Sequence, residues 1–188
     1  MSEESWIQQD RMRYTKNTLS SRLALLAIVL NVLFFVSIYK VNDTHYYTAL
    51  IGLSILYNLV FMLATFLASE GVKNYKIHFS ILLMILAVGQ IIRIFIIPSK
   101  MFATPIDDKI PLGEIIKITE TTTPLEKGAE PIVTVTEVEN RVMETSQHIR
   151  VIVYLVLSAV CLTASAVVNV LKGRALSAHI ASLSLQKA

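Results

Sequence analysis

The sequence predicts an all-α membrane protein: a bundle of four transmembrane helices with a small extracytoplasmic β-hairpin inserted between helices 3 and 4. Three observations predict this fold class. The 188 residues are 54% hydrophobic and only 16% charged, with a mean hydropathy of +0.58, which is outside the usual balance of a soluble domain. Four long apolar stretches contain only one of the 31 charged residues. The roughly 50 residues between the last two stretches are much more polar.

Each apolar stretch is long enough, or nearly so, to cross a bilayer as a helix. The stretches are 23–39, 46–68, 79–98 and 151–171. A hydrocarbon core of ~30 Å needs roughly 20 residues of helix, and only a helix satisfies every backbone group in such apolar segments. The first stretch follows 22 more polar residues and precedes no small-residue cleavage site, so we expect a retained helix rather than a signal peptide.

Charge near the first helix predicts the orientation. Arg11, Arg13, Lys16 and Arg22 precede this helix, whereas only Lys40 follows it closely. The positive-inside rule therefore places the N-terminus in the cytoplasm, and four crossings return the C-terminus to the same side. The inside segments then hold 9 basic and 4 acidic residues, against 7 and 10 outside. We expect a multi-pass protein of the cytoplasmic membrane, the default for a chain without processing signals.

The same pattern divides the chain into five parts. They are a cytoplasmic N-terminal segment (1–22), helices 1–3 (23–98), an extracytoplasmic loop with the hairpin (99–149), helix 4 (150–172) and a cytoplasmic amphipathic segment (173–188). In the last part Leu176, Ile180 and Leu183 recur at helical spacing. This spacing predicts either a short amphipathic helix on the membrane surface or a continuation of helix 4.

Two segments of the polar loop have the composition of β-strands. Residues 114–121 (EIIKITET) and 132–139 (IVTVTEVE) are rich in Ile, Val and Thr with partial alternation, and Gly and Pro flank them. We expect an antiparallel hairpin. A lone two-stranded hairpin is marginal in water, so it must pack against the outer helix ends, a second copy of the chain or a partner protein.

Polar side chains form a stripe on two of the helices. The stripes consist of Tyr47, Ser54, Asn58 and Thr65 in helix 2 and of Tyr154, Ser158, Cys161 and Ser165 in helix 4. At 100° per residue, the members of the first stripe fall within about 40° of one another. Polar and small residues on membrane helices usually face other helices. We therefore interpret the stripes, and Asn31 in helix 1, as packing surfaces, with a transport path as the alternative.

Gln90 and Arg93 in helix 3 are the sharpest polar feature of the spans. A charge inside a span is costly and marks a candidate functional site. Arg93 lies roughly 8 Å from the helix end at 1.5 Å per residue, so we expect its guanidinium to reach toward the outer interface. There it would pair with Asp43, a carboxylate of the polar loop or a partner subunit. Binding of an anion or an acidic substrate is the alternative.

The sequence contains few residues in patterns that are typical of catalysis or of metal binding. Its four histidines are dispersed without a metal-binding spacing, and its one cysteine, Cys161, lies among apolar residues. Nucleotide-binding and nucleophile motifs are lacking, as are acidic clusters within the spans. We predict no enzyme, no catalytic residue, no metal and no cofactor. The basic pI of about 9.0 fits attraction to anionic lipid, so no nucleic-acid partner is predicted.

Inside termini, a short first outer loop and a larger second one resemble the layout of the tetraspanins. The resemblance is one of topology only. The larger loop, residues 99–148, contains no cysteine, whereas the corresponding tetraspanin loop is held by disulfides. Layout does not transfer function, so we assign no family from it.

These observations favour a non-catalytic accessory or assembly subunit of a larger membrane complex, for example a transporter. Its partners would be the lipid bilayer and either another integral membrane protein or further copies of the chain. One alternative is a small oligomeric transporter or channel, and a second is a membrane sensor whose outer hairpin binds a ligand. The residues expected to contact a partner or substrate are Gln90, Arg93, Ser54, Asn58, Thr65, Ser158 and Ser165.

Overall fold

The computed structural model describes residues 16–39, 48–122 and 132–186. Its elements are the helices α2 (Thr18–Tyr39), α3 (Thr48–Lys73), α4 (Ile77–Ile96), α5 (Pro98–Phe102) and α6 (Thr145–Gln186), and the strands β1 (Ile115–Thr122) and β2 (Ile132–Glu139). Within these residues, four helical segments are long and apolar enough to cross a membrane. The predicted four long helices and the two-stranded antiparallel sheet are therefore confirmed.

The helices extend beyond the apolar stretches that predicted them. Helix α2 begins five residues before the stretch at 23–39, and α3 continues to Lys73. The difference is largest for α6, which has 42 residues. Hydropathy identifies only the part of a helix that suits lipid, whereas the backbone ladder continues until a residue or turn ends it. For residues 173–186 the structure shows a continuation of the fourth helix, one of the two expected alternatives.

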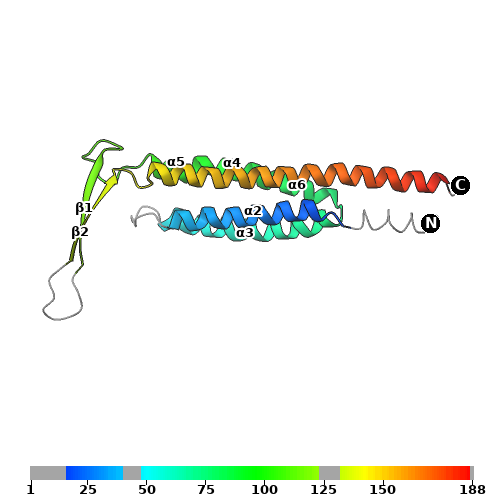
Figure 1. The fold of residues 1–188 in the computed structure, drawn as a ribbon, viewed down its shortest axis with the longest axis horizontal. Coiled ribbons are helices and arrows are strands. Elements are labelled where there is room, and N and C mark those ends of the chain that lie inside the picture. Colours follow the sequence, from blue (N-terminus) through cyan, green and yellow to red (C-terminus); the bar gives the residue numbers. More distant parts are fainter. Residues whose placement is uncertain (1–15, 40–47, 123–131, 187–188) are drawn as a thin grey trace, which may run out of the picture.

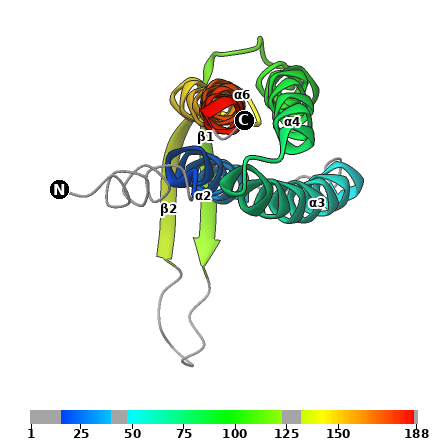
Figure 2. The ribbon, with the colours of Figure 1, turned by 90° about the vertical axis from the view of Figure 1, so that its right-hand side faces the viewer.

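The four long helices form a bundle in which α2 and α4 occupy opposite corners. Helix α2 packs against α3 and α6, and α4 packs against the same two helices from the other side (Figure 2). The first residue of α2 and the last of α6 lie at one end of the bundle and the hairpin lies at the other (Figure 1). We refer to these as the terminal end and the hairpin end.

Small side chains line the most extensive helix contact, that between α2 and α6. The buried alanines at this contact and in the adjoining core are Ala24, Ala27, Ala68, Ala87, Ala159 and Ala166. Small residues let helix backbones approach each other in a membrane, where hydrophobic burial between helices gives little driving force. Large aliphatic side chains instead cover the outside of the bundle, which is the surface expected to face lipid.

The turn between α3 and α4 is tightly built. Tyr75 takes a left-handed conformation with φ of 59°, and the N–H groups of Tyr75 and Lys76 donate to the carbonyls of Val72 and Gly71, both at 3.1 Å. This pattern is a Schellman cap, which satisfies the last carbonyls of α3. A side chain on Gly71 would overlap the ring of Phe79, so glycine is required there for space.

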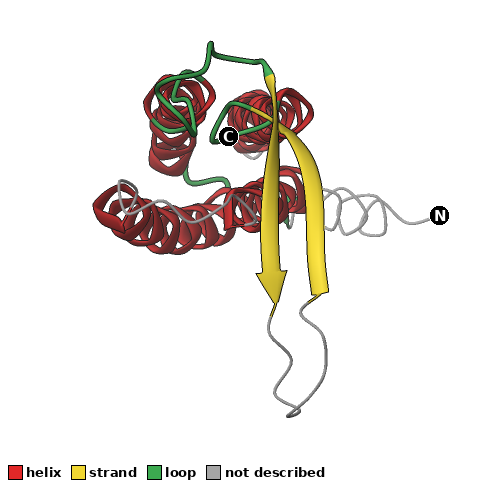
Figure 3. Cartoon of the chain, turned by 90° about the vertical axis from the view of Figure 1, so that its left-hand side faces the viewer, coloured by secondary structure: helices red, strands yellow, loops and turns green. Residues whose placement is uncertain are grey.

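The hairpin projects from the bundle instead of packing on it. Strands β1 and β2 pair antiparallel, from Ile115 opposite Glu139 to Thr122 opposite Ile132. They lie beyond the helix ends and run across the bundle axis (Figures 1 and 3). Ile115 and Val135 are 69% and 55% exposed. The helix ends, one of the three supports expected for the hairpin, therefore do not cover these two side chains.

A single asparagine anchors the base of the hairpin. The fully buried Asn140 side chain accepts hydrogen bonds from the N–H groups of Ile106 and Asp107, at 3.0 and 2.9 Å. Its amide nitrogen donates to the carbonyls of Asp107 and Ile110, at 3.0 and 2.7 Å. These bonds replace backbone pairing that an irregular loop cannot supply itself. They hold the 106–111 loop to the end of β2.

Replacing Gly71 with alanine is expected to destabilise the bundle by about 1–3 kcal/mol, because the added methyl group forces the Phe79 ring to move. Gly52→Ala is the matched control, since open space surrounds Gly52 and alanine in a helix interior is better than glycine by about 0.5–1 kcal/mol. Unfolding in detergent followed by circular dichroism measures both. Equal effects of the two substitutions would contradict the packing at Gly71.

Candidate functional site

The sharpest feature of the site is the Arg93 side chain, which α4 directs into the centre of the bundle. Arg93 is only 4% exposed. Its Nη1 donates to the Oδ1 atoms of Asn31 on α2 and Asn58 on α3, each at 2.9 Å. Its Nη2 donates to Ser54 Oγ on α3 at 2.8 Å. Hydrogen bonds to a charged group contribute about 1.5–3 kcal/mol each. The Arg93 side chain therefore links α4 to both α2 and α3.

Further contacts complete this site. The Arg93 guanidinium carbon lies 4.1 Å from the ring centre of Phe34 and 4.7 Å from that of Tyr57, both within cation–π range. Gln90 Nε2 donates to Asn31 Oδ1 at 3.3 Å, and Asn31 Nδ2 donates to Asn58 Oδ1 at 2.9 Å. We call Asn31, Ser54, Asn58, Gln90 and Arg93 the asparagine–arginine cluster.

Helical spacing explains why these side chains meet. Asn31 and Phe34 are three residues apart on α2, Ser54 and Asn58 are four apart on α3, and Gln90 and Arg93 are three apart on α4. Residues at such spacings lie on one face of a helix. Each helix thus turns one polar face inward, and the three faces meet at the same depth of the bundle.

The surroundings of Arg93 differ from the expected ion pair at the outer interface. Within the described residues, the ion pairs join Lys73 to Glu70, Lys117 to Glu137 and Arg141 to Glu139, and none involves Arg93. Its charge is instead held by neutral oxygens and ring faces inside the bundle. Inward polar faces on α2 and α3 supply closer acceptors than the bundle end does. The other expected partner, Asp43, lies outside the described residues.

A second polar cluster joins the helices near the terminal end. Ser20 Oγ on α2 donates to the Ser165 carbonyl on α6 at 2.6 Å, and Ser165 Oγ donates to the Ser20 carbonyl at 2.7 Å. Asn169 accepts a bond from Asn17 Nδ2 at 3.2 Å and donates to Ser80 Oγ on α4 at 2.7 Å. These five residues, the serine–asparagine cluster, tie α2, α4 and α6 together.

The structure separates the expected contact residues into three groups. Gln90, Arg93, Ser54 and Asn58 come together in the asparagine–arginine cluster. Ser158 and Ser165 instead face α2, and Ser158 Oγ donates to the Ala27 carbonyl at 3.2 Å. Thr65 is buried but lies apart from both groups, and its Oγ1 has no hydrogen-bond partner among the described residues. Tyr47, at the start of the helix 2 stripe, lies outside the described side chains.

The sequence does not reveal the role of several residues of the site. Asn31 was expected only to pack, yet its Oδ1 accepts from both Gln90 and Arg93. The ring contacts of Phe34 and Tyr57 depend on how the helices pair, which no single-helix pattern reveals. For Ser20 there was a signal, because it precedes the first apolar stretch at helical spacing from Ala24 and Ala27. The apolar stretch begins at residue 23, so hydropathy alone leaves Ser20 outside the first span.

The described surface has cavities between α4 and α6, between α2 and α3, and at the hairpin end. Two apolar grooves of about 420 and 490 Å³ lie between α4 and α6. A crevice of about 70 Å³ lies between α2 and α3, with Asn31 and Asn58 among its lining residues. A polar cavity of about 330 Å³ lies at the hairpin end, between the end of α2 and the start of α6.

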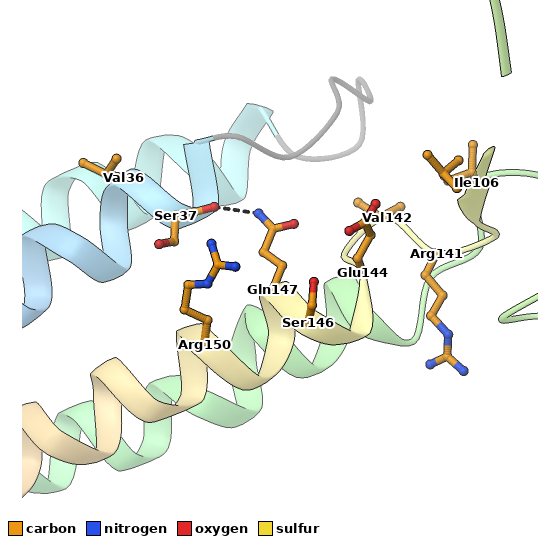
Figure 4. Close-up of a pocket in the computed structure, with 10 residues that line it drawn as sticks. Val36, Ser37, Ile106, Arg141, Val142, Glu144, Ser146, Gln147 and Arg150 are labelled. Atoms are coloured by element: carbon orange, nitrogen blue, oxygen red, sulfur yellow. Dashed lines mark hydrogen bonds between the residues drawn. The ribbon is translucent and has the colours of Figure 1, made fainter. Parts of the chain in front are cut away.

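The polar cavity has no convergent charged site (Figure 4). Gln147 Nε2 donates to the Ser37 carbonyl at 2.6 Å, and the Arg150 guanidinium turns toward α2. Arg141 turns away, with its guanidinium carbon 4.2 Å from the ring centre of Phe102. The two arginines therefore do not act on one ligand. Among the described residues, no group of three or more His, Cys, Asp or Glu side chains is arranged to hold a metal ion.

Comparison with known proteins gives no relative from which to transfer a role. Neither the scan of protein-family models nor the searches of curated proteins and of solved structures found a significant match. The function is therefore argued from the geometry alone.

Removing Asn31 and Arg93 singly and together is expected to give strongly non-additive losses of stability. Residues within one hydrogen-bond network couple by about 0.5–3 kcal/mol, whereas distant residues add within about 0.5 kcal/mol. We expect coupling between Asn31→Ala and Arg93→Met, and additivity between Asn31→Ala and Ser165→Ala as the control. Unfolding free energies of the single and double variants in detergent measure this. Additivity of the first pair would show that the cluster does not act as a unit.

Proposed function

We propose that this protein is a non-catalytic accessory or assembly subunit of a larger membrane complex, such as a transporter. The observation that carries the proposal is the exposure of two apolar side chains of the hairpin. Two strands alone bury little apolar surface and are marginal in water, yet Ile115 and Val135 remain mostly exposed. A pair of eight-residue strands that leaves these two apolar side chains exposed offers a surface suited to another protein.

The polar side chains of the spans also support this proposal. The side chains that would line a transport path are Ser54, Asn58, Ser158 and Ser165, and all four are buried. They hydrogen-bond with other helices of the same bundle, which is the usual role of such residues in membranes. The three hydroxyl groups and the Asn58 Oδ1 are therefore occupied in holding the bundle together.

The length of α6 provides a second element for docking. Its 42 residues correspond to roughly 63 Å of helix at 1.5 Å per residue, about twice the ~30 Å hydrocarbon core. Residues 174–182 are exposed or half-buried, including Ile180. This part of the helix extends beyond the other helices at the terminal end (Figure 1) and is available to a partner.

The alternative function, a small oligomeric transporter or channel, is favoured by one observation. Arg93 and Gln90 place a charge and an amide within the apolar spans, and intramembrane charges often mark substrate pathways. Flux through reconstituted vesicles, with Arg93→Leu as the control, tests it. Flux that Arg93→Leu abolishes without loss of folding would support transport over the accessory function.

The decisive experiment for the accessory function is the mass of the native particle after mild detergent extraction, with the copurifying chains identified. We expect a different integral membrane protein in fixed ratio. The Asn140 N–H donates to the Glu114 carbonyl at 2.6 Å, so a variant in which a short Gly-Ser linker joins Glu114 to Asn140 should fold but lose this partner. A particle that contains only this chain would overturn the proposal.

The proposed topology places both termini in the cytoplasm and the hairpin outside. We expect a membrane-impermeant thiol reagent to label Lys117→Cys in intact cells and to label Lys73→Cys only after permeabilisation, in a Cys161→Ala background. Lys117 lies on β1 and Lys73 ends α3 at the opposite end of the bundle. The reverse labelling pattern would show that the topology is the opposite of the proposed one.

A further inference from the structure

We propose that the asparagine–arginine cluster receives a carboxylate from a transmembrane helix of a different membrane protein, which docks over the crevice between α2 and α3. The inference rests on the proposed function, because it names the chemistry by which the partner of an accessory subunit is recognised within the membrane.

The first argument is charge. Arg93 is 4% exposed, and the groups bonded to it in the described part of the chain are amide and hydroxyl oxygens. Such dipoles orient toward the cation but leave a full positive charge in a medium of low dielectric constant. A carboxylate is the group that arginine binds best, because its fork of N–H donors matches the two carboxylate oxygens.

The second argument is an unused donor at the same place. The Asn58 side chain is 3% exposed, and its Nδ2 has no hydrogen-bond partner among the described residues. A buried amide N–H without an acceptor costs about 1–3 kcal/mol. An incoming carboxylate oxygen would accept from this group while it neutralises Arg93. One ligand would thereby satisfy both deficits.

The third argument is access from the side of the bundle. The crevice of about 70 Å³ is lined by Asn31 and Asn58 together with apolar residues of both helices, and the surface that it exposes is apolar, so a carboxylate reaches the two amides when the side chains at the rim turn aside. Because liquid water occupies roughly 30 Å³ per molecule, a carboxylate head fits this space. At its rim Val32 and Leu59 are 41% and 57% exposed. These side chains belong to the apolar surface expected to face lipid, so a helix in the same bilayer reaches the crevice laterally.

The composition of the chain excludes a second copy as the carboxylate donor. The four apolar stretches contain no aspartate or glutamate. Asn31 lies eight residues before the end of α2 at Tyr39, which is roughly 12 Å inside the helix end. A carboxylate that a transmembrane helix carries to this depth therefore comes from a different protein.

The test uses the full-length protein and a defined probe helix in phosphatidylcholine vesicles at pH 8. The probe is a Leu/Ala transmembrane peptide that carries one Glu eight residues from one end, and its matched control carries Gln there. Energy transfer from a dye on Ala178→Cys, in a Cys161→Ala background, reports association. We expect the Glu peptide to bind about tenfold more tightly than the Gln peptide, as one charge-assisted hydrogen bond predicts.

Substitutions at two positions, Arg93 and Leu59, show which side chains the preference for the Glu peptide depends on. Arg93→Gln should abolish it and Arg93→Lys should retain part of it, with circular dichroism to confirm that each variant is folded. Leu59→Trp should also abolish the preference, because it fills the rim of the crevice and leaves the cluster itself intact. Leu63→Trp is its matched control, since Leu63 is exposed on the same helix, lies one turn beyond Leu59 and does not line the crevice.

Equal binding of the Glu and Gln peptides would overturn the inference, as would a preference that survives both Arg93→Gln and Leu59→Trp. Neither result would affect the accessory function, which the native particle mass tests separately. Conversely, a native particle without another protein, combined with a clear Glu preference, would overturn the accessory function and leave the docking chemistry of the cluster established.

Discussion

The rest of the bundle depends on the need to hold one guanidinium group inside an apolar medium. A charge there is costly, and Arg93 meets that cost with acceptors from α2 and α3 and with two ring faces. Because a helix turns 100° per residue, a shift of one residue in either partner helix would remove its acceptor. The cluster therefore sets the rotation and the register of α2, α3 and α4 relative to one another.

Helix α6 is positioned by a different kind of contact. Small residues bring it close to α2, and the reciprocal bonds between Ser20 and Ser165 fix its height. The serine–asparagine cluster lies toward the terminal end, whereas the asparagine–arginine cluster lies toward the hairpin end. Two polar layers at different depths restrain the tilt of the helices better than one layer would. Apolar contacts with lipid and with neighbouring helices are too similar in energy to restrain the tilt.

The sequence alone was enough to predict the helices and the hairpin, because hydropathy and strand composition are local signals. The inward faces of α3 and α6 were also predictable from the spacing of Ser54, Asn58, Ser158 and Ser165. The partners of Arg93 were not, because they lie 35 to 62 residues away along the chain. Distance from the helix end suggested an outward arginine. Which way a long side chain turns depends on acceptors that only the packed bundle brings near it.

The order of the helices along the chain has a consequence for biosynthesis. The acceptors of Arg93 belong to α2 and α3, which precede α4, and chains emerge from the ribosome N-terminal end first. In a chain that inserts in this order, Asn31 and Asn58, which bond to each other at 2.9 Å, would enter the membrane before the charged helix. The insertion of α4 would then be assisted by a prepared polar surface, and a permuted chain with α4 first would have to insert its arginine unaided.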